Sequence, residues 1–397
     1  MIAEQQTWSR QERRVVLAAF LGWTLDAFDF FLIVFIIKDI ATAFATPLKG
    51  VTYAITLTLM LRPVGAFLSG YLADRLGRRP VLMASVALYA LTNFLSALAP
   101  SLAVLLVLRA LFGIAMGGEW GVGASLALET VAMQRRGMVS GILQMGYPAG
   151  YLLAAACNDL AHDLIGWRGM LMLGLAPALL VLYIRRHVPE SPGWQRQSHV
   201  LAPVLQHWRR FAYCVVLMAC FNFLSHGTGD IYPTFLRQEH HMDSHHVGRI
   251  AMLYSLAAMA GGFVGGLLSE RFGRRLAIAA MALLAAPFAY PWAFGQDFLT
   301  LAFGAMIVHF AVQGAWGVVP AHLNELSPPQ ARATFPGFTY QLGNLIAAAT
   351  ATWQVGLAER LGRFDMALGL WVWAVIGMLV LVTLVGPEVK GQRFTTG

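Results

Sequence analysis

The chain alternates long apolar runs with short polar breaks, and this pattern predicts a bundle of membrane-spanning helices. Each apolar run is about 20 residues long, which suits the ~30 Å of hydrocarbon that a transmembrane helix must cross. The first run is full length and follows 14 polar residues, so we expect a retained span and no cleavable signal peptide. The twelve predicted helices cover residues 15–38, 50–73, 80–99, 101–127, 138–159, 168–185, 211–236, 247–269, 275–295, 298–321, 333–358 and 364–386.

The composition supports a membrane protein and gives no support to an enzyme. Hydrophobic residues make up 58% of the chain and charged residues 12%, with a mean hydropathy of +0.62. Soluble domains usually carry about a quarter charged residues. The sequence contains no nucleotide-binding glycine loop, no nucleophile–His–Asp pattern and no metal-ligand spacing. The three cysteines lie in apolar runs, so we expect small buried side chains, with no metal and no cofactor.

The loops between the predicted helices differ in their content of Lys and Arg. If both termini are cytoplasmic, the cytoplasmic segments hold 19 of the 28 basic residues and the external segments hold seven. This bias predicts a multi-pass protein of the inner (plasma) membrane with both termini in the cytoplasm. It also accounts for the net charge of +8 without a nucleic-acid partner.

The second half of the sequence repeats the first. The string "GYLADRLGRR" at residues 70–79 recurs as "GLLSERFGRR" at residues 266–275, an offset of 196. The same offset relates Trp120 to Trp316, Glu129 to Glu325, Gln134 to Gln330, Arg136 to Arg332 and Gly141 to Gly337. One constant offset across separate regions indicates a duplication of a six-helix unit.

A GxxxDRxGRR pattern in a short cytoplasmic loop, present here twice, resembles the signature of the major facilitator superfamily. This resemblance implies an all-α membrane protein, with twelve transmembrane helices in two six-helix bundles and a solute site between them near the bilayer midplane. The expected units are a bundle at 1–187, a cytoplasmic linker at 188–210 and a bundle at 211–397. The resemblance also implies gating roles for the loop residues Asp74, Arg75, Arg78, Glu270, Arg271 and Arg274, which otherwise only anchor the loops in the cytoplasm.

Several predicted helices carry polar side chains at mid-depth. A charged side chain there costs at least about 2.5 kcal/mol, so such residues are functional candidates. The first half places charges there: Asp26, Asp29, Arg62, Arg109 and Glu119. The second half places mostly amides and imidazoles: Asn222, His226, Asp230, His309, Gln313, Gln341 and Asn344. Because Asn222, His226 and Asp230 are spaced by four residues, they share one helical face, which we expect to point away from lipid.

The string "NFLSHGTGDIYPT" at residues 222–234 resembles the signature of the sialate:proton symporter family, as do "GWTLDAFDFF" in the first helix and "QLGN" in the eleventh. That family includes lactate permeases and sialic acid carriers. It usually has Gln before the Asp, where this chain has Gly229, and Pro233 favours a broken helix. The resemblance implies proton-coupled symport, by alternating access, of a small monocarboxylate such as lactate or pyruvate.

The candidate site residues follow from this hypothesis. Arg109 can hold a carboxylate through two parallel hydrogen bonds, and a nearby carboxylate, Asp29 or Asp26, would exchange a proton for the charge of the substrate. The expected substrate-binding residues are Arg109, Asn222, His226, Gln341, Asn344, Tyr147 and Gln144. The expected proton-coupling residues are Asp26, Asp29, Asp230 and Glu119. The expected partners are a small organic anion, a proton and the lipid bilayer, with the protein a monomer.

Other interpretations remain open at this point. Arg109 alternatively forms a structural ion pair with Asp29 or Glu119, and His226 alternatively bonds only a helix neighbour. The substrate is alternatively sialic acid, another organic acid or a drug for efflux, and a non-transporting sensor is the remote alternative.

Overall fold

The computed structural model describes residues 8–392 and 394, and within them the chain is helical with no strand. The first half contains α1 (Arg10–Phe35), α2 (Ile37–Ala43), α3 (Leu48–Leu76), α4 (Arg78–Ala97), α5 (Leu102–Gly117), α6 (Glu119–Thr130), the 3₁₀ helix η1 (Met133–Arg135), α7 (Arg136–Gln144), α8 (Gly146–Leu173) and α9 (Pro177–His187). The short α10 (Leu201–Gln206) lies within the predicted linker.

The second half repeats this order. It contains α11 (Trp208–Gly229), α12 (Tyr232–Gln238), α13 (Ser244–Phe272), α14 (Arg274–Phe294), α15 (Phe298–Trp316), α16 (Val319–Leu326), the 3₁₀ helix η2 (Pro329–Ala331), α17 (Thr334–Ala347), α18 (Thr350–Leu361) and α19 (Phe364–Val385).

The predicted twelve spans are confirmed, although several are built from two helices. Ten stretches are long and apolar enough to cross a membrane. One of them, Met133–His187, has 55 residues and turns back at Gly166, which has φ 63°, so it crosses twice. The pair α17–α18 supplies the remaining crossing.

The breaks inside spans were not predicted, apart from the one near Pro233. The predicted helix 101–127 is interrupted at Gly118, between α5 and α6, and α7 and α8 meet at Met145. Pro320 stands in the first turn of α16 and Pro233 in the first turn of α12. Proline is tolerated there because the first turn of a helix leaves its N–H groups without intrahelical partners.

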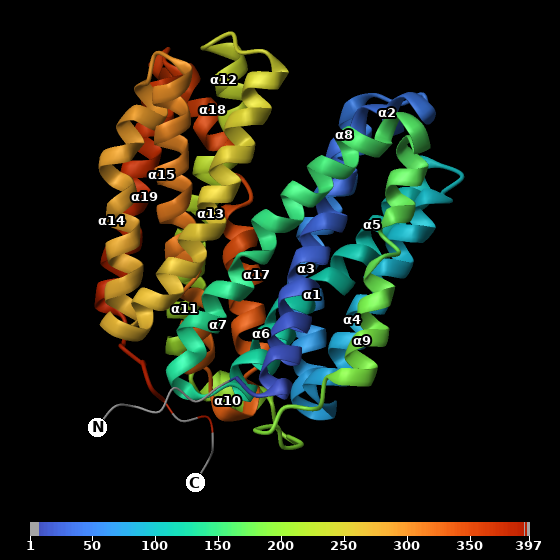
Figure 1. The fold of residues 1–397 in the computed structure, drawn as a ribbon, viewed down its shortest axis with the longest axis vertical. Coiled ribbons are helices and arrows are strands. Elements are labelled where there is room, and N and C mark those ends of the chain that lie inside the picture. Colours follow the sequence, from blue (N-terminus) through green and yellow to red (C-terminus); the bar gives the residue numbers. More distant parts are fainter. Residues whose placement is uncertain (1–7, 393, 395–397) are drawn as a thin grey trace.

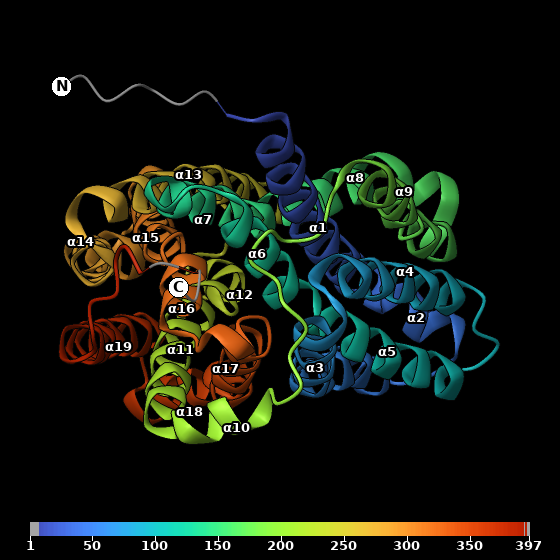
Figure 2. The same cartoon turned by 90° about the horizontal axis from the view of Figure 1, so that it is seen from below.

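The two halves stand side by side and are joined at one end, as Figure 1 shows. We call this the terminal end, because α1 begins and α19 ends there, and the opposite end the far end. The halves diverge toward the far end, and the view from below shows α7 beside α13 and α17 near α3 (Figure 2). The structure is therefore closed between the halves at the terminal end.

Backbone packing between the halves is close at the terminal end. A Cβ added at Gly121 of α6 would lie 2.7 Å from the Cα of Gly337 in α17, and one at Gly141 of α7 would lie 2.6 Å from the carbonyl oxygen of Gly262 in α13. Only glycine permits such an approach. These contacts hold the two halves together at the terminal end. They therefore determine which polar side chains of the two halves lie next to each other.

Candidate functional site

Asp26 and Asp29 of α1 are both fully buried in the first half. Neither carboxylate has a hydrogen-bond partner among the residues that the structure describes. Asp29 lies near the turn at Gly174, where a Cβ would be 3.0 Å from its Oδ1 and would also meet the amide of Asn93. Both side chains are therefore buried among helices of their own half, and not at a site shared with the second half.

Arg109 of α5 also points into the first half, with 0% of its surface exposed. Its Nη1 donates a hydrogen bond to Oδ1 of Asn93 in α4 at 2.7 Å, and its guanidinium lies 3.8 Å from the ring centre of Phe112. Asp29 is the carboxylate that interacts electrostatically with the Arg109 guanidinium. Packed helices surround Arg109 in this conformation, so no substrate reaches its guanidinium. Arg109 and His226 therefore do not line a common site.

Arg62 of α3 is buried in the same half. Its Nη2 donates to the sulfur of Met116 at 2.7 Å, and its guanidinium lies 4.8 Å from the ring centre of Phe30. Its charge acts on Asp26. The first half therefore holds two arginine–aspartate neighbours, Arg109 with Asp29 and Arg62 with Asp26, in its interior.

His226 is the centre of a second polar cluster, in α11 and α17. Its Nε2 is 2.8 Å from Oδ1 of Asn344, and its Nδ1 is 2.9 Å from Oδ2 of Asp230. Asn344 in turn lies 3.5 Å from Gln341. The side chains of His226 and Asp230 are 27% and 48% exposed, so this cluster is only partly covered by the protein. His226 thus forms a hydrogen bond with Asp230, one turn away, as the alternative of a bond to a helix neighbour expects. It also forms one with Asn344 of α17.

Asn222 contributes less than predicted in this state. Its Nδ2 donates to the carbonyl oxygen of Met218 on its own helix at 2.7 Å, and the side chain is buried. An amide that satisfies its own helix does not present that N–H to a ligand, because the donor is occupied.

Gln144 and Tyr147 lie where the two halves meet. The side-chain oxygen of Gln144 accepts a hydrogen bond from Nε1 of Trp120 at 3.1 Å, and its backbone oxygen accepts one from Gln313 of α15 at 2.7 Å. The ring of Tyr147 lies 5.5 Å from that of Trp23. An aromatic cluster from both halves adjoins them: Trp23, Trp120, Tyr147, Trp316 and Tyr340.

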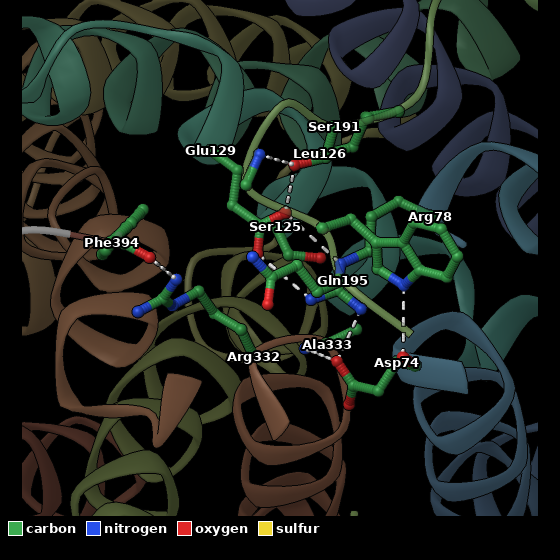
Figure 3. A network of polar contacts seen from close by, with 12 residues as sticks. Asp74, Arg78, Ser125, Leu126, Glu129, Ser191, Gln195, Arg332, Ala333 and Phe394 are labelled. Atoms are coloured by element: carbon green, nitrogen blue, oxygen red, sulfur yellow. Dashed lines mark hydrogen bonds and ion pairs between the residues drawn. The ribbon is translucent and has the colours of Figure 1, made fainter. Parts of the chain in front are cut away.

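The first copy of the duplicated loop forms a polar network at the terminal end, shown in Figure 3. Arg78 pairs with Asp74 at 2.5 Å and with Glu129 at 3.1 Å. Asp74 also crosses to the other half, where it accepts hydrogen bonds from the backbone N–H groups of Ala333 at 3.1 Å and Thr334 at 2.9 Å. Its carboxylate therefore binds the start of α17, where unpaired N–H groups favour a negative charge.

The second copy of the loop repeats the arrangement. Arg274 pairs with Glu325 at 2.9 Å, and Glu270 accepts a hydrogen bond from the backbone N–H of Gly137 in α7. Two of the predicted gating residues lie outside this network: Arg75 donates to Tyr71, and the carbonyl oxygen of Arg271 accepts from Lys390. Their side chains make no ion pair across the halves among the described residues.

Two glutamates missed by the sequence analysis cap the helices that follow the loops. Glu190 accepts from the backbone N–H groups of Arg78 and Arg79, and Glu388 accepts from those of Arg274 at 3.1 Å and Arg275 at 3.0 Å. Partial burial acts to raise the pKa of Glu388, but the N–H groups that it accepts from outweigh this and lower the pKa. The dipeptide Pro-Glu after the last helix of each half was the available signal.

Phe394 lies between two arginines of opposite halves that the repeat relates to each other. Arg136, which begins α7, has its guanidinium carbon 3.2 Å from the ring centre, and Arg332, before α17, has its own at 4.0 Å. Arg332 also donates to the carbonyl oxygen of Phe394 at 2.9 Å, and Arg136 to that of Gln392 at 2.6 Å. The segment after α19 thus contacts both halves.

Comparison with known proteins shows what the chain is similar to. The sequence model of the Major Facilitator Superfamily matches residues 19–229 and again residues 214–396. A carboxylic acid transporter protein homolog of Saccharomyces cerevisiae is 26% identical over 90% of this chain, which spans 62% of that relative. A probable 4-methylmuconolactone transporter of Cupriavidus pinatubonensis is 29% identical, over 98% of this chain and 94% of the relative.

Two further comparisons agree. The sialic acid transporter NanX of Escherichia coli is 25% identical, over 98% of both chains. Among solved structures, the proton:xylose symporter XylE has a TM-score of 0.75 at 18% identity, with 97% of this chain and 98% of that chain covered. At that identity the structural likeness indicates the fold alone, in agreement with two six-helix bundles.

Proposed function

Because the chain belongs to the major facilitator superfamily, we propose that it is a secondary active transporter that carries a small organic monocarboxylate, of the lactate or pyruvate type, together with a proton. Its similarity to a carboxylic acid transporter homolog and to a sialic acid transporter supports an organic acid as substrate. The protein would work as a monomer in the inner (plasma) membrane, with the terminal end in the cytoplasm.

The observation that carries the proposal is the fully buried Arg109 near the fully buried Asp29. Charges at such a depth are costly, so a chain retains them where they act on an ion or a proton. When Asp29 is ionised, it neutralises Arg109. When Asp29 takes up a proton, the positive charge of Arg109 is uncompensated and favours an anion between the halves.

This arrangement couples proton and anion without a direct contact between Arg109 and the substrate. The coupling is reciprocal, so an anion bound between the halves also favours the protonated form of Asp29. We therefore assign Arg109 to the proton site and not to the substrate contacts, which differs from the sequence-based expectation.

The substrate contacts are assigned to the polar side chains near the junction of the halves. Both ring nitrogens of His226 are engaged in this state, by Asp230 and Asn344, so a carboxylate or hydroxyl group would bind there by replacing the bond between His226 and Asn344. Gln341, Gln144 and Tyr147 supply further donors from α17, α7 and α8. Asp230 holds His226 in its orientation through the bond to Nδ1.

Uptake into liposomes tests the proposal. The purified protein is reconstituted, an inward proton gradient is imposed, and the accumulation of radiolabelled lactate is measured. We expect accumulation that depends on the gradient and is lost in Arg109→Gln. Uptake that ignores both the gradient and this substitution would exclude proton-coupled lactate transport.

A larger organic acid is the second candidate, and Gly229 is the observation that favours it. A Cβ added at Gly229, three residues from His226, meets no atom within 4 Å, so that part of the site is open. The similarity to the transporters of 4-methylmuconolactone and sialic acid also supports it. Unlabelled sialic acid and cyclic acids added as competitors to lactate uptake distinguish the two candidates.

A further inference from the structure

Glu119 is a buried carboxylate that the mechanism above does not use. It begins α6, at the break with α5, and is 1% exposed. Neither of its carboxylate oxygens has a hydrogen-bond partner in the part of the chain that the structure describes. The carboxylate lies against Gly22 of α1, where a Cβ would collide with it. An unpaired carboxylate in such a place is costly unless it is protonated or reaches water.

A small cavity adjoins this carboxylate. Its volume is about 10 Å³, close to what one water molecule requires. Trp23 also lines it, and the indole Nε1 of Trp23 is likewise without a partner among the described residues. A water molecule there would donate to Glu119 and accept from Trp23, which gives it the two polar partners that a buried water needs.

The buried carboxyl groups of the first half lie in a row beside or on α1. Glu119 of α6 contacts α1 at Gly22. Asp26 lies one helical turn beyond Gly22 on the same face, and Asp29 lies nearly one turn further toward the far end. Asp26 is the ionisable group whose charge acts on Glu119. The other ionisable groups that interact with these carboxyl groups include two arginines: Arg62 of α3 acts on Asp26, and Arg109 of α5 acts on Asp29. Three tyrosines also lie near them: Glu119 acts on Tyr89 of α4, and Asp26 acts on Tyr147 and Tyr340.

The cavity is closed toward the terminal end by apolar residues. Ala19 of α1 and Gly123 of α6 line it on that side, one turn closer to the terminal end than Trp23 and Glu119. Leu143 of α7 also lines the cavity. Because α7 packs against α13 of the other half, separation of the halves at the terminal end would move this seal. In the present state, these apolar side chains offer a proton at Glu119 no acceptor in that direction.

From these observations we propose that Glu119 is the proton-release site on the terminal side. It takes up the proton that Asp26 releases and delivers it, through the water of the adjoining cavity, only when the terminal end opens. The Asp26 carboxylic acid loses one proton as the Glu119 carboxylate gains one. Asp26 is left ionised beside Arg62, and the total charge is unchanged. The inference rests on the proton coupling proposed above.

The first experiment separates proton release from substrate movement. Glu119→Gln is compared with wild type in liposomes for two activities: lactate accumulation driven by a proton gradient, and exchange of labelled for unlabelled lactate at equal pH. We expect accumulation to fall by about tenfold or more, while exchange, which needs no net proton release, stays within about threefold. Glu119→Asp, which keeps a carboxyl group, should recover part of the accumulation.

The inference is overturned if Glu119→Gln accumulates lactate as wild type does. It is also overturned if accumulation and exchange fall together and Glu119→Asp recovers neither, because Glu119 would then be structural. Absence of gradient-driven accumulation in wild type would instead contradict the proposed function.

A second measurement does not depend on the substrate. Infrared difference spectra of wild type minus Glu119→Gln should contain the band of a protonated carboxyl group, and Asp26→Asn should shift that band, because the two groups interact. The matched control is Glu239→Gln, at an exposed position of the far end, for which no such band is expected. A spectrum without the band would refute a proton held at Glu119, whatever the protein transports.

Discussion

Arg109 shows how far single residues can be predicted from the sequence. Counting residues from the helix ends placed it at mid-depth, and its complete burial fits that depth. The direction of the side chain did not follow, because α5 is apolar on all sides and its pattern marks no face. The partner Asn93 was missed, although an amide inside the predicted helix 80–99 was a usable signal. By contrast, the spacing of His226 and Asp230 correctly predicted that they share one face.

Gly229 allows a direct test of the substrate site. We expect Gly229→Gln, which introduces the amide usual in the resembled family, to fold with a stability within about 1 kcal/mol of wild type, because its Cβ meets nothing within 4 Å and glutamine favours helix more than glycine. The added side chain should reduce competition by bulky acids relative to lactate, as measured in competition uptake.

Gly227 is the matched control for this substitution. A Cβ there would lie 2.5 Å from Nε1 of Trp371, so Gly227→Gln should lower the melting temperature in detergent. If Gly229→Gln melts as early as Gly227→Gln, the space beside His226 is not available.

At the scale of elements, apolar runs predicted where spans lie but not where they break. The apolar pattern continues across the interruptions at Gly118 and between α17 and α18, so it carries no signal for them. The turn at Gly166 lies in the polar break between two predicted helices, and that division was therefore visible in the sequence. Breaks inside apolar runs are set by tertiary packing, which a single sequence does not display.

Close packing of α3 against α5 leads to a prediction about Gly113. A Cβ there would collide with the carbonyl oxygen of Thr58, and backbone cannot move aside as a side chain does. We expect Gly113→Ala to destabilise the protein by about 1–3 kcal/mol, measured as thermal unfolding in detergent. Gly377→Ala in α19 is the control: nothing lies within 4 Å of its Cβ, so its melting temperature should stay equal or rise. Equal losses in both would show that helix α5 is not held in this contact.

The cap at Glu388 predicts a dependence of stability on pH. Partial burial acts to raise its pKa, but its backbone donors hold the pKa below 4.5 in the folded state. Its stabilising effect is therefore complete above pH 4.5 and is lost as the pH falls through the folded-state pKa. Since the side chain is partly exposed, we expect Glu388→Gln to lose only a few tenths of a kcal/mol. The difference in melting temperature from wild type should be present at pH 7 and vanish at pH 3; a difference that persists at pH 3 would contradict a charge effect.

At the scale of the whole molecule, the duplication was sufficient to predict two six-helix bundles, but not how they meet. A constant offset of 196 identifies equivalent helices, yet says nothing about which ends touch. In the structure Asp74 binds the start of α17 and Glu270 the start of α7, so each copy of the loop holds the other half. Both contacts must break if the terminal end opens.

Phe394 leads to a prediction about the balance between the states that are closed and open at the terminal end. Its ring, 7% exposed, lies between Arg136 of the first half and Arg332 of the second, so opening of the terminal end must separate it from at least one guanidinium. Contacts of this kind contribute about 0.5–2 kcal/mol each. We therefore expect Phe394→Ala to increase the population open at the terminal end by about tenfold, whereas Phe394→Tyr, which keeps the ring, should resemble wild type.

Distances between spin labels measure this balance. Leu76 and Phe272 are exposed, repeat-related positions at the terminal end of α3 and α13, and Lys49 and His245 are their counterparts at the far end. In Phe394→Ala the distance between labels at Leu76 and Phe272 should gain a longer component, and that between labels at Lys49 and His245 a shorter one, because the halves rock as rigid bodies. Lengthening at both ends would indicate loosening of the halves and not rocking. Distributions identical to wild type would mean that the stacked arginines contribute nothing to closure, and that the loop carboxylates alone hold the terminal end.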